Sequence, residues 1–276
     1  MPDHPSERSR SAGSGPFEYR GRWALVTGAS MGIGEAFAWA LAARGMNLVL
    51  CARSADRLQA LGDALRREHG IETQVVAADL AVPGAAARAW EQASAEHPVH
   101  LLVNNAGFGL RGRFHELPRE RQAEMVSLNC TALLELAHLA VGEMRERGAG
   151  GIINVASIVA FQPVPSMAAY AATKAFVLSL SESLAVENRQ AGVRVMALCP
   201  GPTPSGFQAV AGTRVYEGQP GYLTPEQVVA GGLDAFDADR AHVVPGAANR
   251  AATLFGRLLP LGVAARIALR VNQRHG

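Results

Sequence analysis

Short apolar segments alternate with longer segments of helical pattern over most of this chain, and this alternation is what most limits its fold. The apolar segments are hydrophobic at consecutive positions, which is typical of strands buried on both faces of a parallel sheet. Strand and helix repeat as units, and such units connect by right-handed crossovers. The pattern predicts an α/β fold: a doubly wound parallel sheet of about seven strands with helices on both faces.

The expected element boundaries follow from where each pattern begins and ends. The predicted strands are Trp23–Thr27, Asn47–Ala52, Gln74–Ala78, Leu101–Asn104, Ile152–Ala156, Val193–Leu198 and His242–Val244. The predicted helices are Gly34–Arg44, Ala55–Glu68, Gly84–Glu96, Arg119–Arg147, Ala168–Gln190 and one that starts at the capping sequence Thr224-Pro-Glu-Gln.

We expect one folded domain, because 276 residues suffice for a large α/β domain and no internal repeat is present. Residues 1–16 are polar and rich in Ser, Pro and Gly, so they are predicted to be a disordered tail, and residues 17–276 to form the single domain. The tail lacks the apolar core of a signal peptide, and no apolar run reaches the roughly 18 residues of a membrane span. We therefore expect a cytoplasmic protein without a transmembrane segment.

Charge and cysteine content exclude several classes of function. The chain has a net charge of +2, and its basic residues alternate with acidic ones, so nothing indicates nucleic-acid binding. Cys51, Cys130 and Cys199 lie far apart and have no Cys-x-x-Cys spacing, which argues against a disulfide framework or a zinc site. We expect no bound metal, and three small core residues kept reduced.

A glycine-rich turn joins the first predicted strand to the first predicted helix. Gly28, Gly32 and Gly34 would let the backbone turn tightly and approach a pyrophosphate, and the helix N-terminus would offer free N–H groups. Ser30, Met31 and Ile33 complete the turn. The spacing Thr-Gly-x-x-x-Gly-x-Gly resembles the cofactor loop of the short-chain dehydrogenases/reductases, which implies a Rossmann-type fold with a bound nicotinamide dinucleotide.

The end of the second predicted strand suggests the coenzyme. The resemblance places Ala52 where NAD-using members of the family carry an aspartate, and Arg53 follows it. A guanidinium pairs with the 2′-phosphate of NADP(H), whereas a carboxylate would repel it. We therefore expect NADP(H), held by Arg53 with Ser30 and Ser54. NAD(H) stays open as an alternative, because Met31 occupies a position that is often basic in NADP-using members.

Three further segments resemble cofactor contacts of the family. Asp79 and Leu80 end the third predicted strand and resemble the pair that contacts adenine. Asn104-Asn-Ala-Gly107 ends the fourth strand and matches the family's Asn-Asn-Ala-Gly signature, which implies cofactor contacts from Asn105, Ala106 and Gly107. The segment after Cys199 resembles the stretch over the nicotinamide and implies contacts from Pro200, Gly201, Thr203 and Ser205.

Tyr170 and Lys174 are four residues apart in a predicted helix, so both side chains lie on one helix face. A phenol has a pKa of about 10, and a nearby ammonium is expected to lower that pKa by roughly 1–3 units. Such a tyrosine can act as a general acid or base.

Ser157 ends a predicted buried strand thirteen residues before the tyrosine, and Asn129 lies in the long predicted helix. In the family that this chain resembles, the matching serine holds the substrate oxygen, and the matching asparagine holds a water that links the lysine to solvent. The resemblance thus implies a catalytic set of Asn129, Ser157, Tyr170 and Lys174, with Tyr170 and Lys174 also contacting the cofactor.

The resemblance implies an oxidoreductase acting on CH–OH groups, which interconverts a ketone and a secondary alcohol. The residues expected around the substrate are largely apolar and favour a hydrophobic carbonyl compound, such as a ketoacyl chain, a steroid-like ketone or a polyketide. They are Phe108, Leu110, Phe161, Val164, Met167, Phe207 and Tyr216. Two other functions stay open: an NAD-dependent alcohol dehydrogenase, and a non-catalytic NADP-binding protein with a regulatory or structural role.

Two segments carry several interpretations. Residues 200–223 are rich in Pro and Gly, and are either a substrate lid or a mobile surface loop. Residues 247–276 are expected to form a C-terminal helical extension. Within it, Leu254–Val271 is either a packed terminal helix, a lid, a contact with another subunit or an element on a membrane surface. Because the family commonly pairs the helices that carry Asn129 and Tyr170, we expect a homodimer or homotetramer.

Overall fold

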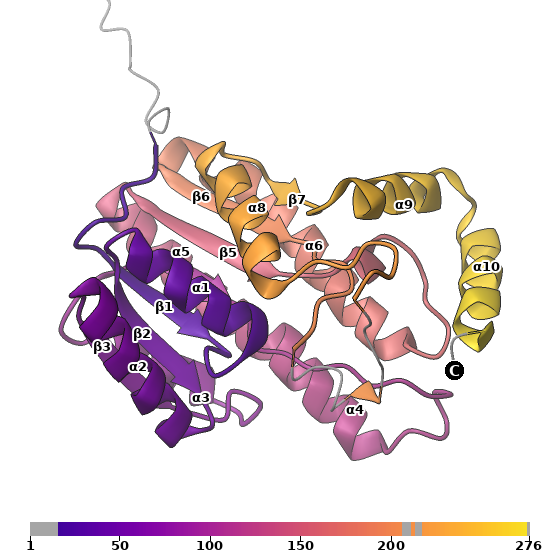
Figure 1. Cartoon of the computed structure of the whole chain (residues 1–276), viewed down its shortest axis with the longest axis horizontal. Helices are drawn as coiled ribbons and strands as arrows, with labels where there is room; N and C mark the ends of the chain where they lie inside the picture. Colours follow the sequence, from indigo (N-terminus) through magenta and orange to yellow (C-terminus); the bar gives the residue numbers. More distant parts are fainter. Residues whose placement is uncertain (1–15, 206–210, 213–216, 275–276) are drawn as a thin grey trace, which may run out of the picture.

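The computed structural model of this chain describes residues 16–205, 211–212 and 217–274. Almost the whole predicted tail and part of the predicted lid therefore lie outside the described residues. The described chain folds around a seven-stranded parallel sheet with the order β3-β2-β1-β4-β5-β6-β7 (Figure 1). The strands are β1 (Trp23–Thr27), β2 (Asn47–Ala52), β3 (Thr73–Ala77), β4 (Val99–Asn104), β5 (Gly150–Val155), β6 (Val193–Leu198) and β7 (His242–Val243). The predicted doubly wound sheet is confirmed.

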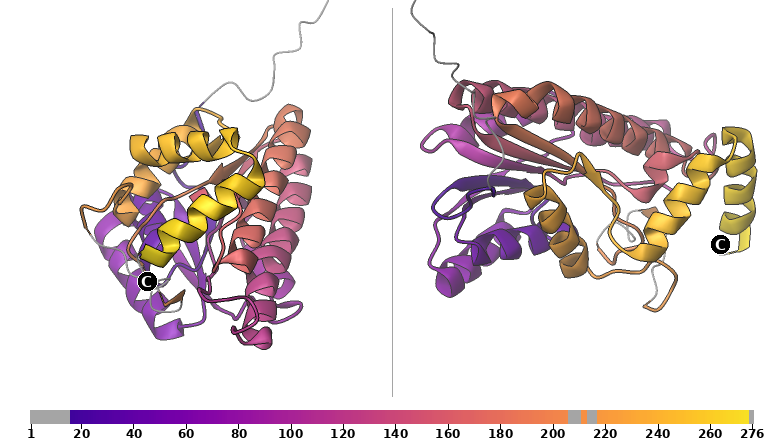
Figure 2. Two further views of the ribbon diagram at one scale, coloured as in Figure 1. Left: turned by 90° about the vertical axis from the view of Figure 1, so that its right-hand side faces the viewer. Right: turned by 90° about the horizontal axis from the view of Figure 1, so that it is seen from above.

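Helices cover both faces of the sheet. On one face lie α1 (Gly32–Ala43), α2 (Ala55–His69) and α8 (Pro225–Asp237), which bury Phe37, Leu58 and Phe236 against the strands. On the other face lie α3 (Ala85–Ser94), the continuous helix α4–η1–α5 and α6 (Ala168–Asn188), which bury Trp90, Leu136 and Val177 (Figure 2). Within that long helix, α4 is Arg119–Val126, the π-helical turn η1 is Ser127–Ala132, and α5 is Leu133–Arg147.

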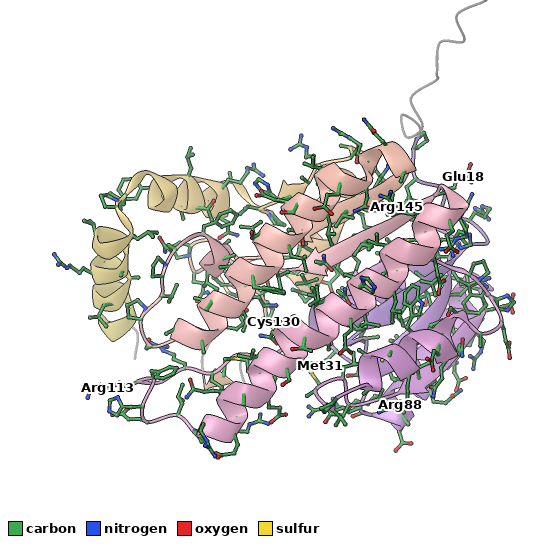
Figure 3. The ribbon with its side chains drawn as sticks, turned by 180° about the vertical axis from the view of Figure 1, so that it is seen from behind. Glu18, Met31, Arg88, Arg113, Cys130 and Arg145 are labelled. Carbon is green, nitrogen blue, oxygen red and sulfur yellow. The ribbon has the colours of Figure 1, made fainter. Side chains whose placement is uncertain are left out.

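The long helix Arg119–Arg147 is apolar and long enough to cross a membrane by length and composition alone. Its buried side chains include Met125, Leu133 and Leu136, which pack in the protein core. This helix runs beside α6 across the back of the molecule (Figure 3). The packing is that of a core helix of an α/β domain.

Local signals set several helix ends. Thr224 begins α8 with a complete capping box: its Oγ1 accepts a hydrogen bond from the Gln227 backbone N–H at 3.3 Å, and Gln227 Oε1 accepts one from the Thr224 N–H at 3.0 Å. Pro225 supplies the first turn, where no N–H partner is needed. The first helix, by contrast, begins at Gly32 rather than at the predicted Gly34.

Beyond β7 the chain forms α9 (Ala247–Leu258) and α10 (Leu261–Arg274), separated near Pro260. α9 packs on the short 3₁₀ turn η2 (Ile158–Phe161), and α10 lies further out at one end of the molecule (Figures 1 and 2). Because every strand of the sheet is parallel, this pair of helices leaves from the same edge at which the other strands end.

Candidate active site

A cavity of about 520 Å³ runs along the carboxyl edge of the sheet. Its walls come from the glycine turn after β1 and from the ends of β2, β3, β4, β5 and β6, with one side closed by α6. Ligands of doubly wound sheets bind in this place, because strand order reverses there and the loops separate. Of the residues predicted to bind cofactor, Gly32 and Gly34 alone are not in the cavity wall. Those that line it are Gly28, Ser30, Met31, Ile33, Arg53, Ser54, Asp79, Leu80, Asn105, Ala106, Gly107, Tyr170, Lys174, Pro200, Gly201, Thr203 and Ser205.

The glycine turn is clamped from the end of β4. Gly28 has a φ of +65°, which glycine adopts without strain. A Cβ at Gly34 would overlap the Gly28 carbonyl oxygen, so this position also requires glycine. The Asn105 side chain donates hydrogen bonds to the carbonyl oxygens of Thr27 at 2.9 Å and Gly28 at 3.2 Å. The turn is thus held open with the N-terminus of α1 facing the cavity.

The far end of the cavity is suited to a nucleoside. Ala52 ends β2 and lines the cavity, and the exposed Arg53 follows it directly. No carboxylate stands at position 52 to receive two ribose hydroxyls. Asp79 lines the same end, although one of its oxygens accepts a hydrogen bond from the Ala81 backbone N–H at 3.0 Å. Leu80 adds an apolar surface.

Asn104, the first residue of the Asn-Asn-Ala-Gly signature, lies behind the cavity wall. Its side chain donates to Asn154 Oδ1 at 3.0 Å and to the Leu133 carbonyl at 3.3 Å. Asn154 in turn donates to Ser181 Oγ at 2.9 Å. This buried chain of hydrogen bonds ties β4, β5, α5 and α6 together, and so supports the site without touching a ligand.

Ser157, Tyr170 and Lys174 all line the cavity. Ser157 follows β5 and begins η2, where its Oγ accepts a hydrogen bond from the Val159 N–H at 3.3 Å. Its side chain also hydrogen-bonds that of Tyr170. Lys174 Nζ donates to the Val155 carbonyl at 2.8 Å and lies 5.8 Å from the centre of the Tyr170 ring.

Burial dominates the ionisation of both groups on α6. It raises the pKa of Tyr170 to about 12, and the hydrogen bond from Ser157 offsets only part of this rise. Burial lowers the pKa of Lys174 to about 8, against a weaker opposing influence of the Cys130 and Cys199 thiols. The prediction of a lowered Tyr170 pKa is therefore wrong for this arrangement, because desolvation of the phenolate dominates and the Lys174 ammonium is directed at a backbone carbonyl.

Asn129 is brought close to this group but does not line the cavity. Its Nδ2 donates to the Phe108 carbonyl at 2.9 Å and to Thr173 Oγ1 at 3.1 Å, and its Oδ1 accepts from the Phe108 N–H at 3.1 Å. Asn129 lies in the π-helical turn η1, and such turns often occur at functional sites. The hydrophobic pattern of the long helix contains no signal for this turn.

The predicted substrate residues divide into three groups. Phe108 and Met167 line the cavity and pack in one cluster with Tyr170. Leu110 packs against the same cluster without lining the cavity, and Phe161 and Val164 are likewise not in the cavity wall. The Phe161 ring packs 6.0 Å from that of His242 at β7, and Val164 is buried in the turn before α6. Phe207 and Tyr216 lie outside the described residues.

Sequence reasoning missed four polar residues in the cavity wall. They are Arg111, Arg121, Glu124 and Gln219. The Arg121 guanidinium lies 4.7 Å from the centre of the Phe108 ring and pairs with Glu124. In the sequence, these charges are indistinguishable from the solvated face of a helix, because only the fold turns them toward the cavity.

The start of the predicted lid packs against the glycine turn. A Cβ at position 32 would come within 2.6 Å of the Ser205 Cβ, so the two segments are in close contact. Buried Asn249, at the start of α9, donates to the Gly221 carbonyl at 2.9 Å and to the Pro245 carbonyl at 3.0 Å. The described end of the 200–223 segment is thus attached to the base of α9, a link that the sequence did not reveal.

These features fit an elongated dinucleotide with a nicotinamide at one end. The turn held open by glycine accepts a pyrophosphate, Arg53 meets the nucleoside end with a positive charge, and Ser157 and Tyr170 stand at the other end. A carbonyl oxygen placed beside Ser157 and Tyr170 would find one hydrogen-bond donor and one proton donor. The arrangement can therefore support hydride transfer coupled to proton transfer.

Comparisons with known proteins agree with this chemistry. Residues 22–214 match the short chain dehydrogenase family. The 7beta-hydroxysteroid dehydrogenase of Collinsella aerofaciens is 31% identical over 221 residues, which cover 77% of this chain and 81% of that protein. The inactive hydroxysteroid dehydrogenase-like protein 1 of Homo sapiens is 31% identical over 182 residues, which cover 65% of this chain and 55% of that protein. The chain spans only about half the length of several of the curated relatives that it matches.

A solved structure extends the similarity to the whole fold. It is the short-chain dehydrogenase from Sphingobium yanoikuyae in complex with NADPH, with 35% sequence identity and a TM-score of 0.78 over 85% of this chain and 92% of that one. The family match covers most of the chain, and the sheet, the glycine turn and the Tyr170–Lys174 pair agree with it. The protein therefore belongs to the short-chain dehydrogenase/reductase family of oxidoreductases.

Proposed function

We propose that the protein is an NADP(H)-dependent ketoreductase, which interconverts a hydrophobic ketone and its secondary alcohol. The observation that carries this proposal is the meeting of Ser157, Tyr170 and Lys174 in one cavity with the glycine turn. The side chains of Ser157 and Tyr170 interact and both line the cavity, so one substrate oxygen can contact both hydroxyls.

Each residue has a distinct part in the proton transfer. Ser157 donates a hydrogen bond to the carbonyl oxygen and stabilises the negative charge that develops on it. Tyr170 donates its proton to the same oxygen, and its raised pKa of about 12 keeps it protonated at neutral pH. Lys174 holds the cofactor ribose and lies near Tyr170, while Asn129 supports the adjoining loop. When bound, the nicotinamide coenzyme supplies the hydride in reduction and accepts it in oxidation.

Support for NADP(H) comes from the nucleoside end of the cavity. Arg53 offers a guanidinium to a 2′-phosphate, and Ala52 presents no competing carboxylate. Ser30 and Ser54 also line this end and add hydroxyl donors. NAD(H) is the alternative coenzyme.

Support for a hydrophobic substrate comes from the cluster around Tyr170. Phe108, Leu110, Leu128, Val159 and Met167 pack there, and most of them line the cavity. A ketoacyl, steroid-like or polyketide ketone suits such walls. We further propose that residues 200–223 act as a lid, since Ser205 and Gln219 at its two ends line the cavity.

The testing experiment follows the loss of NADPH absorbance with a panel of bulky ketones. Tyr170→Phe removes the proton donor, so turnover should fall by at least 100-fold, on the order of what general acid catalysis contributes. Tyr19→Phe is the matched control and should keep wild-type turnover, because Tyr19 is outside the cavity wall and its hydroxyl donates to Asp237. Normal turnover in Tyr170→Phe would refute the proposed mechanism.

The same assay tests the coenzyme. Arg53→Ala should raise the KM for NADPH about tenfold or more, because a charge-assisted contact to the phosphate is lost, and should leave the KM for NADH unchanged. Arg57→Ala is the control, since this exposed arginine of α2 does not line the cavity. Equal changes for both coenzymes would contradict the role of Arg53.

A non-catalytic function is the second candidate, because the similar protein of Homo sapiens is named as inactive. A nicotinamide-binding protein of that kind would bind NADPH and turn over no ketone of the panel. The presence of Ser157, Tyr170 and Lys174 in one cavity supports the enzyme instead.

A further inference from the structure

The last two helices of the chain differ from the rest of the molecule in charge. Residues 241–276 contain five arginines and neither aspartate nor glutamate, whereas all 24 acidic residues of the chain precede them. These 36 residues therefore carry a positive charge larger than the net charge of the whole protein, +2. The remainder of the chain has a net negative charge.

α9 turns its polar side toward the protein. Asn249 is buried and hydrogen-bonded to two backbone carbonyls of the domain, and Gly256 is buried against Gln162. The opposite side presents Leu254 and Phe255, which are 63% and 62% exposed, together with exposed alanines at 247, 248 and 251. A surface helix of a globular domain normally does the reverse and buries its apolar stripe. The hydrogen bonds of Asn249 fix α9 in this orientation.

α10 continues the exposed apolar surface. Leu261, Val263, Ile267 and Leu269 are each at least 40% exposed, and Ala264 is the buried residue of this helix among those whose side chains are described. Arg250 on α9 and Arg266 on α10 are exposed beside these apolar groups. Both helices lie at one end of the molecule, at the periphery of the fold (Figure 2).

We propose that α9 and α10 form a docking surface for an anionic lipid bilayer. Apolar side chains on one face with arginines as the only charged groups are typical of helices that lie in a membrane interface. Each arginine near an anionic surface contributes attraction, and the apolar side chains enter the boundary between headgroups and acyl chains. The bilayer would lie beside the carboxyl edge of the sheet, where the cavity is.

The exposed face of α9 favours a bilayer over a second protein. Protein interfaces carry about ten direct hydrogen bonds, yet Ala247, Ala248, Ala251, Leu254 and Phe255 offer no side-chain hydrogen-bonding group. A bilayer surface requires none. A second copy of the chain, whose remaining residues are net negative, is the competing occupant, and the experiment separates the two.

The test is co-sedimentation of the full chain with vesicles of phosphatidylcholine alone and of phosphatidylcholine mixed with phosphatidylglycerol. We expect binding to the anionic vesicles, little binding to the neutral ones, and release when the ionic strength rises from about 0.1 M to about 1 M, since the Debye length falls from about 10 Å to about 3 Å. Equal binding to both vesicle types without salt dependence, or binding to neither, would overturn the proposal.

Matched variants locate the surface. Phe255→Ser should weaken vesicle binding about tenfold, from the lost apolar burial. Val82→Ser is the control, because Val82 is 50% exposed and follows β3, at the opposite edge of the sheet from β7, which α9 follows. The double variant Arg250→Glu/Arg266→Glu should weaken binding at least about 25-fold, from about fivefold for each arginine lost. Arg67→Glu/Arg240→Glu makes the same change of charge at exposed sites outside α9 and α10 and should bind like the wild type.

Light scattering distinguishes a second copy of the chain from a bilayer as the partner of this surface. If Phe255→Ser lowers the mass of the protein in solution and leaves vesicle binding unchanged, α9 contacts another copy of the chain and the proposal is wrong. An unchanged mass with weakened vesicle binding supports the bilayer. Turnover of a water-soluble ketone in the same variants reports on the active site separately, so failure of the ketoreductase assignment would leave this result intact.

Discussion

Lys174 is the only lysine in the chain, while arginine supplies every other basic side chain apart from the histidines. Arginine stays charged at any accessible pH, whereas a buried lysine can lose its proton. Lys174 is 6% exposed, donates to the Val155 carbonyl, and has its pKa lowered from 10.5 to about 8 by burial. The one ammonium side chain of the protein thus titrates near the pH range in which the enzyme would work.

This lowered pKa predicts how stability depends on pH. Between about pH 8 and pH 10.5 the unfolded chain binds a proton at Lys174 that the folded chain has released, so the contribution of this residue to the free energy of unfolding rises with pH. The contribution is complete above pH 10.5 and is lost as the pH falls through 8. Its full size is on the order of 3 kcal/mol.

Urea unfolding of the wild type and of Lys174→Met at several pH values checks this prediction. The difference in unfolding free energy between the two should move in favour of the wild type from pH 8 to pH 10. The chain has no other lysine, and both proteins contain Tyr170 and Cys51, whose pKa values burial raises. The difference in unfolding free energy between the two proteins therefore reports on Lys174. Two parallel pH profiles would show that Lys174 is not desolvated.

At the scale of an element, α8 is where local sequence acts most directly. Its N-terminus has both hydrogen bonds of a capping box and a proline in the first turn. Thr224→Ala removes the side-chain acceptor of the Gln227 N–H, so the free energy of unfolding should fall by about 1 kcal/mol. Chemical denaturation measures this loss. Thr224→Ser keeps the hydroxyl and should restore nearly all the stability; a loss of equal size in both variants would assign the effect to packing of the threonine methyl.

At the scale of the whole molecule, two neighbouring helices present large apolar side chains on the face seen in Figure 3. They are Val126 and Leu134 on the long helix and Phe176 and Val186 on α6, all more than a third exposed. We propose that this face joins copies of the chain into a homodimer or homotetramer. Burial of these exposed apolar side chains would drive the association.

Light scattering checks the oligomer prediction. Leu134→Glu/Phe176→Glu should lower the measured mass toward that of one chain, because a buried unpaired carboxylate costs several kcal/mol. Val82→Glu introduces a charge at an exposed valine on another part of the surface and should leave the mass unchanged. An oligomer that persists in the double variant would rule out this face.

The elements and the core of the site could be predicted because their signals are local. Uniformly apolar strands, the glycine turn at Gly28, the Thr224 capping box and the four-residue spacing of Tyr170 and Lys174 each depend on neighbours within a few positions. Neighbours this close in sequence are fixed by the order of the residues, before the chain folds. For this reason the parallel sheet was predictable, as were most of the residues in the cavity wall.

The rest depended on contacts between segments far apart in the chain. Phe108 lines the cavity and Phe161 packs at β7, although both are apolar residues that follow strands. Arg121 enters the cavity wall because α4 packs over Phe108. The upward shift of the Tyr170 pKa comes from burial. The outward apolar face of α9 comes from the hydrogen bonds that Asn249 makes to the domain. Burial is a sum over neighbours that only folding assembles, so the tertiary structure alone could decide these features.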